Sequence, residues 1–191
     1  MLNTSMTKGL LSLTVLVAMV VKGHAGAPCR SGLEPGKRPG PYAAVVSTGP
    51  ERGRSHCYIC ATEDRPAFIV FARNTSEPLG KLAQQLDKAL STHTKEELRG
   101  WVTFLNTDQT AFDPLVVAWG QKHALRTLPL AVFEDPLGPP SYRLSADADI
   151  TILLFVRQKV VANFAFRSGE LTDAASAEVI KALPRILKTG K

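Results

Sequence analysis

Two cysteines three positions apart form the one motif in this chain with clear chemical content. They enclose the segment Cys57-Tyr58-Ile59-Cys60. Cysteines at this spacing can close a small structural disulfide, exchange that disulfide with another thiol, or supply two ligands of a four-ligand metal site. Alanine rather than histidine follows Cys60, so the motif is not a haem attachment site. The other three uses remain open, and the pair is the candidate catalytic site.

Metal binding has the weakest support of the three. His56 precedes the motif and would raise the number of donors to three. No second CxxC and no pair of histidines follows, so we predict no metal and no other cofactor. The remaining cysteine, Cys29, has no obvious partner. It either pairs with Cys57 or Cys60, or stays a free thiol.

The other ionisable residues do not form a recognisable catalytic set. His93 follows a predicted helix, and His123 lies near the end of another, where the helix dipole stabilises a cationic imidazole. Asp147 and Asp149 would share one face of a strand, but we expect them to be solvated loop acids. The Gly-x-Ser-x-Gly, HExxH, phosphate-loop and EF-hand spacings are absent.

Composition limits the class of protein. The chain has 191 residues, of which 45% are apolar and 21% charged, which fits one globular domain and excludes a disordered or collagen-like chain. Three cysteines are too few for a disulfide-dense miniprotein. The formal net charge is +6, but Lys and Arg are scattered rather than grouped with aromatic residues. We therefore predict no nucleic-acid partner, whereas an unidentified protein partner stays open.

The N-terminus has the pattern of a secretory signal peptide over residues 1–25. Lys8 supplies positive charge, an apolar run covers 10–21, and Gly23-His24-Ala25 offers a small-residue cleavage site. We predict cleavage after Ala25 and a secreted or periplasmic protein. The apolar run is shorter than the ~20 residues of a membrane span, and no later run is longer, so we predict no transmembrane segment after signal removal.

Apolar patterns predict a mixed α/β domain over residues 41–191, after a flexible Pro/Gly-rich lead-in over residues 26–40. The uninterrupted apolar run Ala67 to Ala72 predicts a strand buried on both faces. Leucines three and four apart predict an amphipathic helix over 77–90, capped by Ser76. We further predict strands over 42–47, 101–105 and 128–133, and a hairpin of 150–156 and 160–166. A helix is predicted from Asp113-Pro114 to about Leu125, with Leu115, Ala118 and Trp119 inward. A last helix is predicted from Thr172, with a kink at Pro184.

Three stretches in this order carry a resemblance to a known family. They are Arg65-Pro66 leading into the strand over 67–72, Trp119 to Leu125 followed by Leu128-Pro129-Leu130, and the hairpin from Asp149 to Val161. Together they resemble the thioredoxin-like superfamily in its peroxiredoxin and TlpA-like branch. The chain is also similar to uncharacterised secreted proteins of planctomycete-type bacteria with a CxxC before a Val-Phe-Ala-Arg strand. The resemblance implies a single thioredoxin-like domain: a mixed central sheet flanked by helices, with a closing β-hairpin and a C-terminal helix.

The resemblance also implies where redox chemistry belongs, and the sequence departs from it there. Redox-active members place the nucleophilic cysteine just after the buried strand, where the following helix stabilises a thiolate. This chain has Asn74-Thr75-Ser76-Glu77 at that place. Those members also place a cis-proline before the closing strands, where this chain has Asp147-Ala148-Asp149.

These departures predict an exported thioredoxin-fold protein that serves as a binding or structural module. The alternative is a periplasmic thiol-disulfide oxidoreductase that uses Cys57 and Cys60, displaced from the family position but near the same sheet edge. If the chain is an enzyme, a thiol-disulfide oxidoreductase or a peroxiredoxin-like protein is expected. A third hypothesis is a metal-handling protein that uses His56 and both cysteines.

Overall fold

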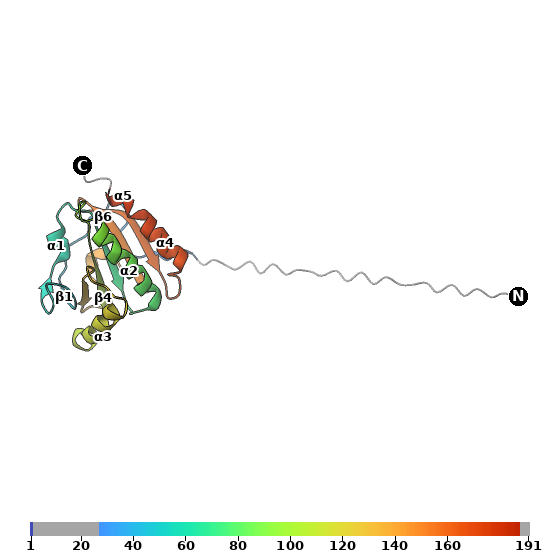
Figure 1. The fold of residues 1–191 in the computed structure, drawn as a ribbon, viewed down its shortest axis with the longest axis horizontal. Coiled ribbons are helices and arrows are strands. Elements are labelled where there is room, and N and C mark those ends of the chain that lie inside the picture. The colour runs from blue at the N-terminus through green and yellow to red at the C-terminus, as the bar shows by residue number, and fades with distance from the viewer. Residues whose placement is uncertain (2–26, 188–191) are drawn as a thin grey trace.

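The computed structural model describes Met1 and residues 27–187, so the predicted signal peptide lies almost wholly outside the described residues (Figure 1). The strands in it are β1 (Ala44–Val46), β2 (Ser55–His56), β3 (Ala67–Ala72), β4 (Arg99–Leu105), β5 (Leu130–Phe133), β6 (Ile150–Val156) and β7 (Lys159–Phe166). The helices are α1 (Tyr58–Thr62), α2 (Glu77–Thr92), α3 (Gln109–Lys122), α4 (Asp173–Ala182) and α5 (Pro184–Leu187), with a 3-10 turn η1 at Pro140–Tyr142.

The seven strands form one mixed sheet in the order β2-β1-β5-β4-β3-β6-β7. Strand β3 is parallel to β4 and antiparallel to β6, and β4 is parallel to β5. All six residues of β3 are buried, as its uninterrupted apolar sequence predicts. The predicted mixed α/β sheet flanked by helices is confirmed.

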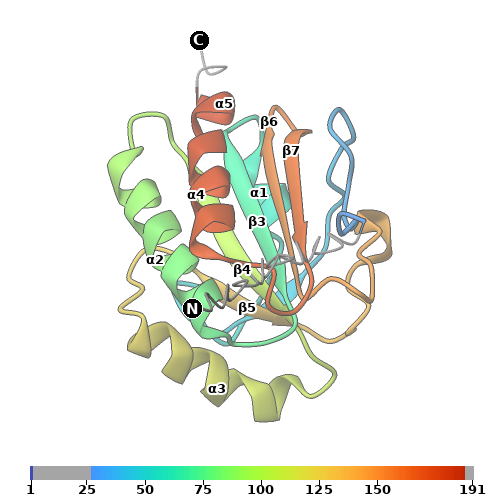
Figure 2. The ribbon, with the colours of Figure 1, turned by 90° about the vertical axis from the view of Figure 1, so that its right-hand side faces the viewer.

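The two faces of the sheet are covered differently. Helices α2, α3 and α4 pack on one face, where Leu86, Trp119 and Val179 belong to one apolar cluster. Figure 2 shows α2 and α4 side by side on that face. The other face is covered by Ile59 of α1 and by irregular segments that contribute Tyr142 and other large side chains. The short helix α1 therefore lies on the face without long helices.

The Pro/Gly-rich lead-in is tied to the sheet from Ser31 onward rather than flexible. Leu33 is buried, and the Val160 N–H donates to the carbonyl of Lys37 at 2.9 Å. The Asn163 side-chain amide donates to the carbonyls of Ser31 and Leu33 at 2.8 and 3.0 Å. These partners lie more than 100 residues away, so the composition of the lead-in alone does not reveal them.

Helix α3 begins earlier than predicted, at Gln109 rather than at Asp113-Pro114. The Asp108 carboxylate caps it by accepting the N–H of Ala111 at 2.9 Å, so the stronger start signal lies upstream and Pro114 falls inside the helix. This shift changes the inward face. Leu115 is 57% exposed, Ala118 is exposed too, and Val116 joins Trp119 in the core.

The C-terminal half follows the prediction closely. Strands β6 and β7 form the predicted hairpin, and Arg157 and Gln158 both have positive φ, at 51° and 54°, as its tight turn requires. Helix α4 ends at Ala182, and α5 begins at Pro184. The break follows from the proline, which cannot continue the hydrogen-bond ladder of α4.

Candidate thiol-disulfide site

Cys57 and Cys60 are joined by a disulfide with a Cα–Cα distance of 5.3 Å, and Cys29 is not disulfide-bonded. The alternative pairings of Cys29 are therefore not seen. Cys57 is the N-cap residue of α1, and its Sγ accepts the backbone N–H of Cys60 at 3.3 Å. After Cys57 the motif forms a five-residue helix, too short to show a helical apolar period in the sequence.

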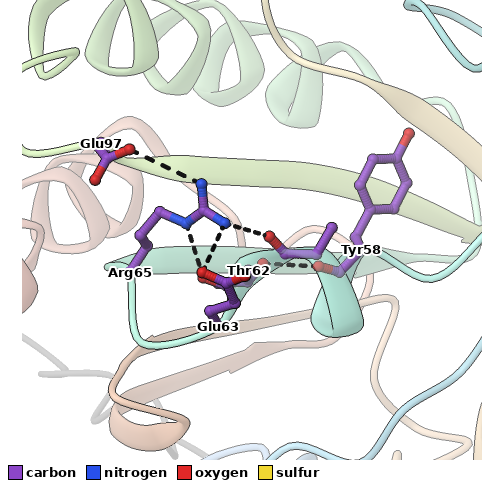
Figure 3. A network of polar contacts seen from close by, with 6 residues as sticks. Tyr58, Thr62, Glu63, Arg65 and Glu97 are labelled. Atoms are coloured by element: carbon purple, nitrogen blue, oxygen red, sulfur yellow. Dashed lines mark hydrogen bonds and ion pairs between the residues drawn. The ribbon is translucent and has the colours of Figure 1, made fainter.

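Arg65 fixes the C-terminal end of this helix. Its guanidinium donates to the carbonyls of Ala61 and Thr62 at 2.8 and 3.1 Å. It also lies 3.3 Å from the Glu63 carboxylate and 3.8 Å from the carboxylate of Glu97, which belongs to the turn between α2 and β4 (Figure 3). A cation at this place satisfies carbonyls that a helix end leaves unpaired and complements the helix dipole.

The remaining contacts of α1 are made through its buried side. Ile59 is buried in the core, and the Thr62 hydroxyl donates to the Tyr58 carbonyl at 2.7 Å. The Tyr58 ring stacks on Trp101 of β4 with centroids 5.1 Å apart, and the Trp101 indole N–H donates to the Tyr42 hydroxyl at 2.8 Å. Burial raises the pKa of Tyr58 to about 12. None of these contacts involves a sulfur atom, whereas the N-cap bond at the other end of α1 is accepted by the Cys57 sulfur.

The two sulfur-bearing residues differ in exposure. Cys60 is exposed, whereas Cys57 is half-buried against the core. A cavity of about 400 Å³ opens beside Cys60 and is lined also by Pro39, Pro41 and Ile59. Cys60 is therefore the more accessible residue of the pair. The sulfur that would leave is that of Cys57, which already accepts an N–H hydrogen bond.

The disulfide and the family position lie at opposite ends of β3. Helix α1 precedes Ala67, the first residue of β3, and the family position follows its last residue, Ala72. Six residues of extended strand span about 20 Å. The expectation that Cys57 and Cys60 lie near the same sheet edge as the family site is therefore wrong, because a segment before a strand and one after it meet opposite edges.

Arg73 directly precedes the family position at Asn74-Thr75-Ser76-Glu77. Its guanidinium donates to the carbonyls of Ala148 and Ser145 at 2.9 and 3.0 Å, and also to that of Pro136. The Arg73 N–H donates to the Asp149 carbonyl at 3.0 Å. These bonds tie the start of α2 to the loop before β6. Among residues 27–187 no peptide bond is cis.

The residues after Arg73 play structural roles. The Asn74 amide donates to the Asp149 carboxylate at 3.3 Å, and the Ser76 hydroxyl accepts the Leu79 N–H at 3.4 Å. The predicted cap of α2 is confirmed. Asp147 is exposed and, like Asp149, precedes β6, so the two acids do not form a strand face.

The histidines do not gather around the cysteines as metal ligands. The His56 ring lies edge-on to Tyr58, with centroids 4.5 Å apart, and no group of three metal-binding side chains occurs in the described part of the chain. His93 lies 3.6 Å from Glu96. His123 ends α3 as predicted but is only 4% exposed, packed over Gly80 rather than solvated.

Two arginines that shape these sites were missed in the sequence. The signal for Arg65 is a cation just after a helix end, but it is visible only once α1 is recognised. The carbonyl partners of Arg73 lie more than 60 residues away, so no local pattern indicates them. Trp101 is buried in the core, but its stacking on Tyr58 depends on the same short helix, which the sequence does not indicate.

Comparison with known proteins shows likeness in structure but not in sequence. No family model matches the chain, and neither does any curated protein. A conserved protein of Geobacillus kaustophilus superposes with a TM-score of 0.61 at 16% identity, covering 86% of this chain and 88% of that one. The peroxidoxin BcpB of Mycobacterium tuberculosis superposes with a TM-score of 0.59 at 12% identity, covering 81% of this chain and 98% of that one.

A secreted disulfide oxidoreductase of Mycobacterium tuberculosis is also similar, with a TM-score of 0.56 at 8% identity. The match covers 75% of this chain and 95% of that one. At such low identities the likeness shows the fold alone. In the part of the chain with described structure, no helix has the length and apolar character to cross a membrane. This chain has a thioredoxin-like fold.

Proposed function

We propose that this chain is an exported thioredoxin-fold protein that carries out thiol-disulfide exchange at Cys57 and Cys60 rather than at the family position. The observation that carries the proposal is the set of contacts of α1 that involve no sulfur atom. Arg65, the burial of Ile59 and the stacking of Tyr58 hold the helix without the sulfur atoms. A disulfide that closes so short a loop adds little to stability, so a structural role alone explains it poorly.

The exposure of the two cysteines sets the direction of attack. A substrate thiolate attacks the Cys60 sulfur, a bond forms between these two sulfurs, and the bond between Cys57 and Cys60 breaks. The electron pair of the broken bond remains on the Cys57 sulfur as a thiolate, which the Cys60 N–H stabilises by a hydrogen bond.

The second step releases the substrate. A second substrate thiolate attacks the substrate sulfur of the mixed disulfide, and the Cys60 sulfur leaves with its electron pair. The substrate is oxidised by two electrons to a disulfide, and the two protons lost by its thiols balance those taken up by Cys57 and Cys60. The reverse sequence reduces a substrate disulfide.

The predicted signal peptide and one of the structurally similar proteins support this assignment. Disulfides form and persist in oxidising compartments, which is where a cleaved signal peptide would deliver the chain. One structural neighbour is described as a secreted disulfide oxidoreductase. A periplasmic or secreted location is therefore part of the proposal.

A binding or structural module is the second candidate, favoured by Arg73. Its guanidinium, next to the family position, donates hydrogen bonds to backbone carbonyls, an arrangement that has no redox chemistry. The reduction potential of the Cys57–Cys60 pair separates the two candidates. A value within the range of exchange proteins, about −120 to −270 mV, supports exchange, whereas a value below about −300 mV indicates a structural disulfide.

Turnover of insulin disulfides by the exported chain with a dithiol reductant tests the function directly. We expect turnover in the parent and in the matched Cys29→Ser variant, which keeps the pair, and none in Cys57→Ser/Cys60→Ser. A parent no faster than the double variant overturns the proposal. Trapping with a monothiol, followed by peptide mass mapping, should place the mixed disulfide on Cys60. Its location on Cys57 would reverse the assigned direction of attack.

A further inference from the structure

A second, larger cavity lies at the same end of the sheet as the disulfide and is not used by the exchange chemistry. Its volume is about 560 Å³, within the range of pockets that hold small molecules. It is enclosed by α1, the last turn of α2 and the first residues of β4. The loop between β1 and β2 and the segment just before β5 complete its walls. Neither cysteine lines it.

One wall of this cavity is aromatic. Tyr58 and Trp101 line it as a stacked pair with their planes 19° apart, and His56 lies against the edge of Tyr58. Leu98 and Pro129 add apolar surface. Because Trp101 is held by its hydrogen bond to a buried hydroxyl, this wall is formed before any ligand arrives. A flat ring or a branched apolar group fits such a surface.

Among the described residues, the charges around the cavity leave the Arg99 guanidinium without a partner. Arg65 and Glu97 lie 3.8 Å apart, and Glu51 lies 3.4 Å from Arg54. Arg99 also lines the cavity, and its guanidinium makes no hydrogen bond or ion pair with any residue of the described chain. Its backbone is fixed, because the Arg99 N–H donates to the Pro66 carbonyl at 2.9 Å. A ligand with an anionic group would pair with it.

We propose that this cavity binds a carboxylate with an aromatic or branched apolar body. The body lies against Tyr58, and the carboxylate accepts hydrogen bonds from the Arg99 guanidinium, whose planar fork matches a carboxylate in two-point contact. Both a free small acid and the C-terminal residue of a peptide have this chemistry. The proposal does not depend on thiol-disulfide exchange, because no sulfur atom takes part.

Calorimetric titration of the exported chain with 3-phenylpropanoate tests the site, with 3-phenylpropanamide as the neutral probe of the same shape. We expect saturable binding of the acid and about tenfold or greater loss of affinity for the amide, the value of a charge-assisted hydrogen bond. Arg99→Gln should remove the preference for the acid. The matched control Arg30→Gln changes an exposed arginine at the other end of the sheet and should keep it.

Two further arms complete the test. A pentapeptide that ends in phenylalanine, compared with its C-terminal amide, distinguishes a peptide terminus from a free acid as the source of the carboxylate. The Cys57→Ser/Cys60→Ser variant should bind 3-phenylpropanoate as the parent does, so a failure of exchange leaves this result intact. Equal binding of acid and amide, no saturable binding, or an unchanged preference in a folded Arg99→Gln variant overturns the proposal.

Discussion

The two ends of strand β3 carry sites of opposite character. At its carboxyl end Arg73, next to the family position, donates hydrogen bonds to three loop carbonyls. At its amino end a disulfide with one exposed cysteine caps a short helix, and two cavities open beside that helix. The same scaffold is thus closed by polar contacts where the family is reactive and open where the family is not. Chemistry is carried by local groups, not by the fold.

Both ends depend on β3 itself, so breaking this strand gives the largest expected effect. Ile69 is fully buried at its centre, and Ile69→Asp would bury a carboxylate without a partner. The free-energy cost of this buried charge should be comparable with the whole free energy of unfolding of a typical domain, about 5–15 kcal/mol. We therefore expect the variant not to fold. Circular dichroism melting checks this. A cooperative transition at the parent temperature would show that β3 is not central.

Arg73→Met sharpens the comparison by opening the carboxyl end alone. It removes the donors of three carbonyls while keeping much of the side-chain volume, so we expect a loss of about 2–4 kcal/mol in the free energy of unfolding. The exchange rate of the disulfide, about 20 Å away, should not change. Denaturant titration measures the first quantity and stopped-flow reduction by dithiothreitol the second.

Arg126→Met is the matched control for this change. Arg126 is exposed, and its side chain makes no hydrogen bond or ion pair with the described residues, so its loss should cost less than about 0.5 kcal/mol. An Arg73→Met variant as stable as this control would mean that the family position is not held closed by the arginine. A slower or faster exchange rate in Arg73→Met would mean that the two ends of β3 are coupled.

The sequence predicts the elements of this fold where the signal is repeated over many residues. The apolar run of β3, the leucine spacing of α2 and the β6–β7 hairpin were each recognised from their own residues. Strand β2 and helix α1 are two and five residues long, so neither is long enough to repeat the apolar pattern of its element. The helix that bears Cys60 is therefore not recognisable from the sequence alone.

The site itself was only half predictable. The residue types identify Cys57 and Cys60 as the chemical pair, but accessibility and the contacts of α1 depend on tertiary structure. Arg65 reaches Glu97, 32 positions away, and Tyr58 stacks on Trp101, 43 positions away. The pair lies at the amino end of β3 because its helix precedes this strand, whereas the family position follows the strand. The pattern of apolar residues alone does not show this difference.

Removal of the disulfide should have a smaller effect than either change in β3. The chain-entropy relation gives about 2 kcal/mol for a loop of this length, so Cys57→Ser/Cys60→Ser should lose no more than that in the free energy of unfolding. Denaturant titration beside oxidised parent measures the loss. A loss of 4 kcal/mol or more would show that the disulfide holds the amino end of β3 together and would favour the structural module over exchange.

The smallest expected effect is on Tyr58, and it tests whether α1 keeps its place without the disulfide. Burial raises the Tyr58 pKa to about 12, and burial also raises those of Tyr42 and Tyr142 above the ordinary value near 10. The phenol is then neutral in the folded protein at pH values where the unfolded chain begins to ionise. Its contribution to stability is complete below pH 10 and is lost as the pH rises from 10 towards 12.

Tyrosinate absorbance near 295 nm follows this ionisation, and all three tyrosines of the chain contribute to it. If Arg65, Ile59 and Trp101 fix α1 as the contacts indicate, the absorbance of Cys57→Ser/Cys60→Ser between pH 9 and 11 should match that of the oxidised parent. If the disulfide holds the helix, its loss exposes Tyr58, and one tyrosine should titrate near pH 10. Arg65→Met in the double variant supplies the positive control, because loss of the carbonyl contacts at the end of α1 should free Tyr58 to titrate earlier.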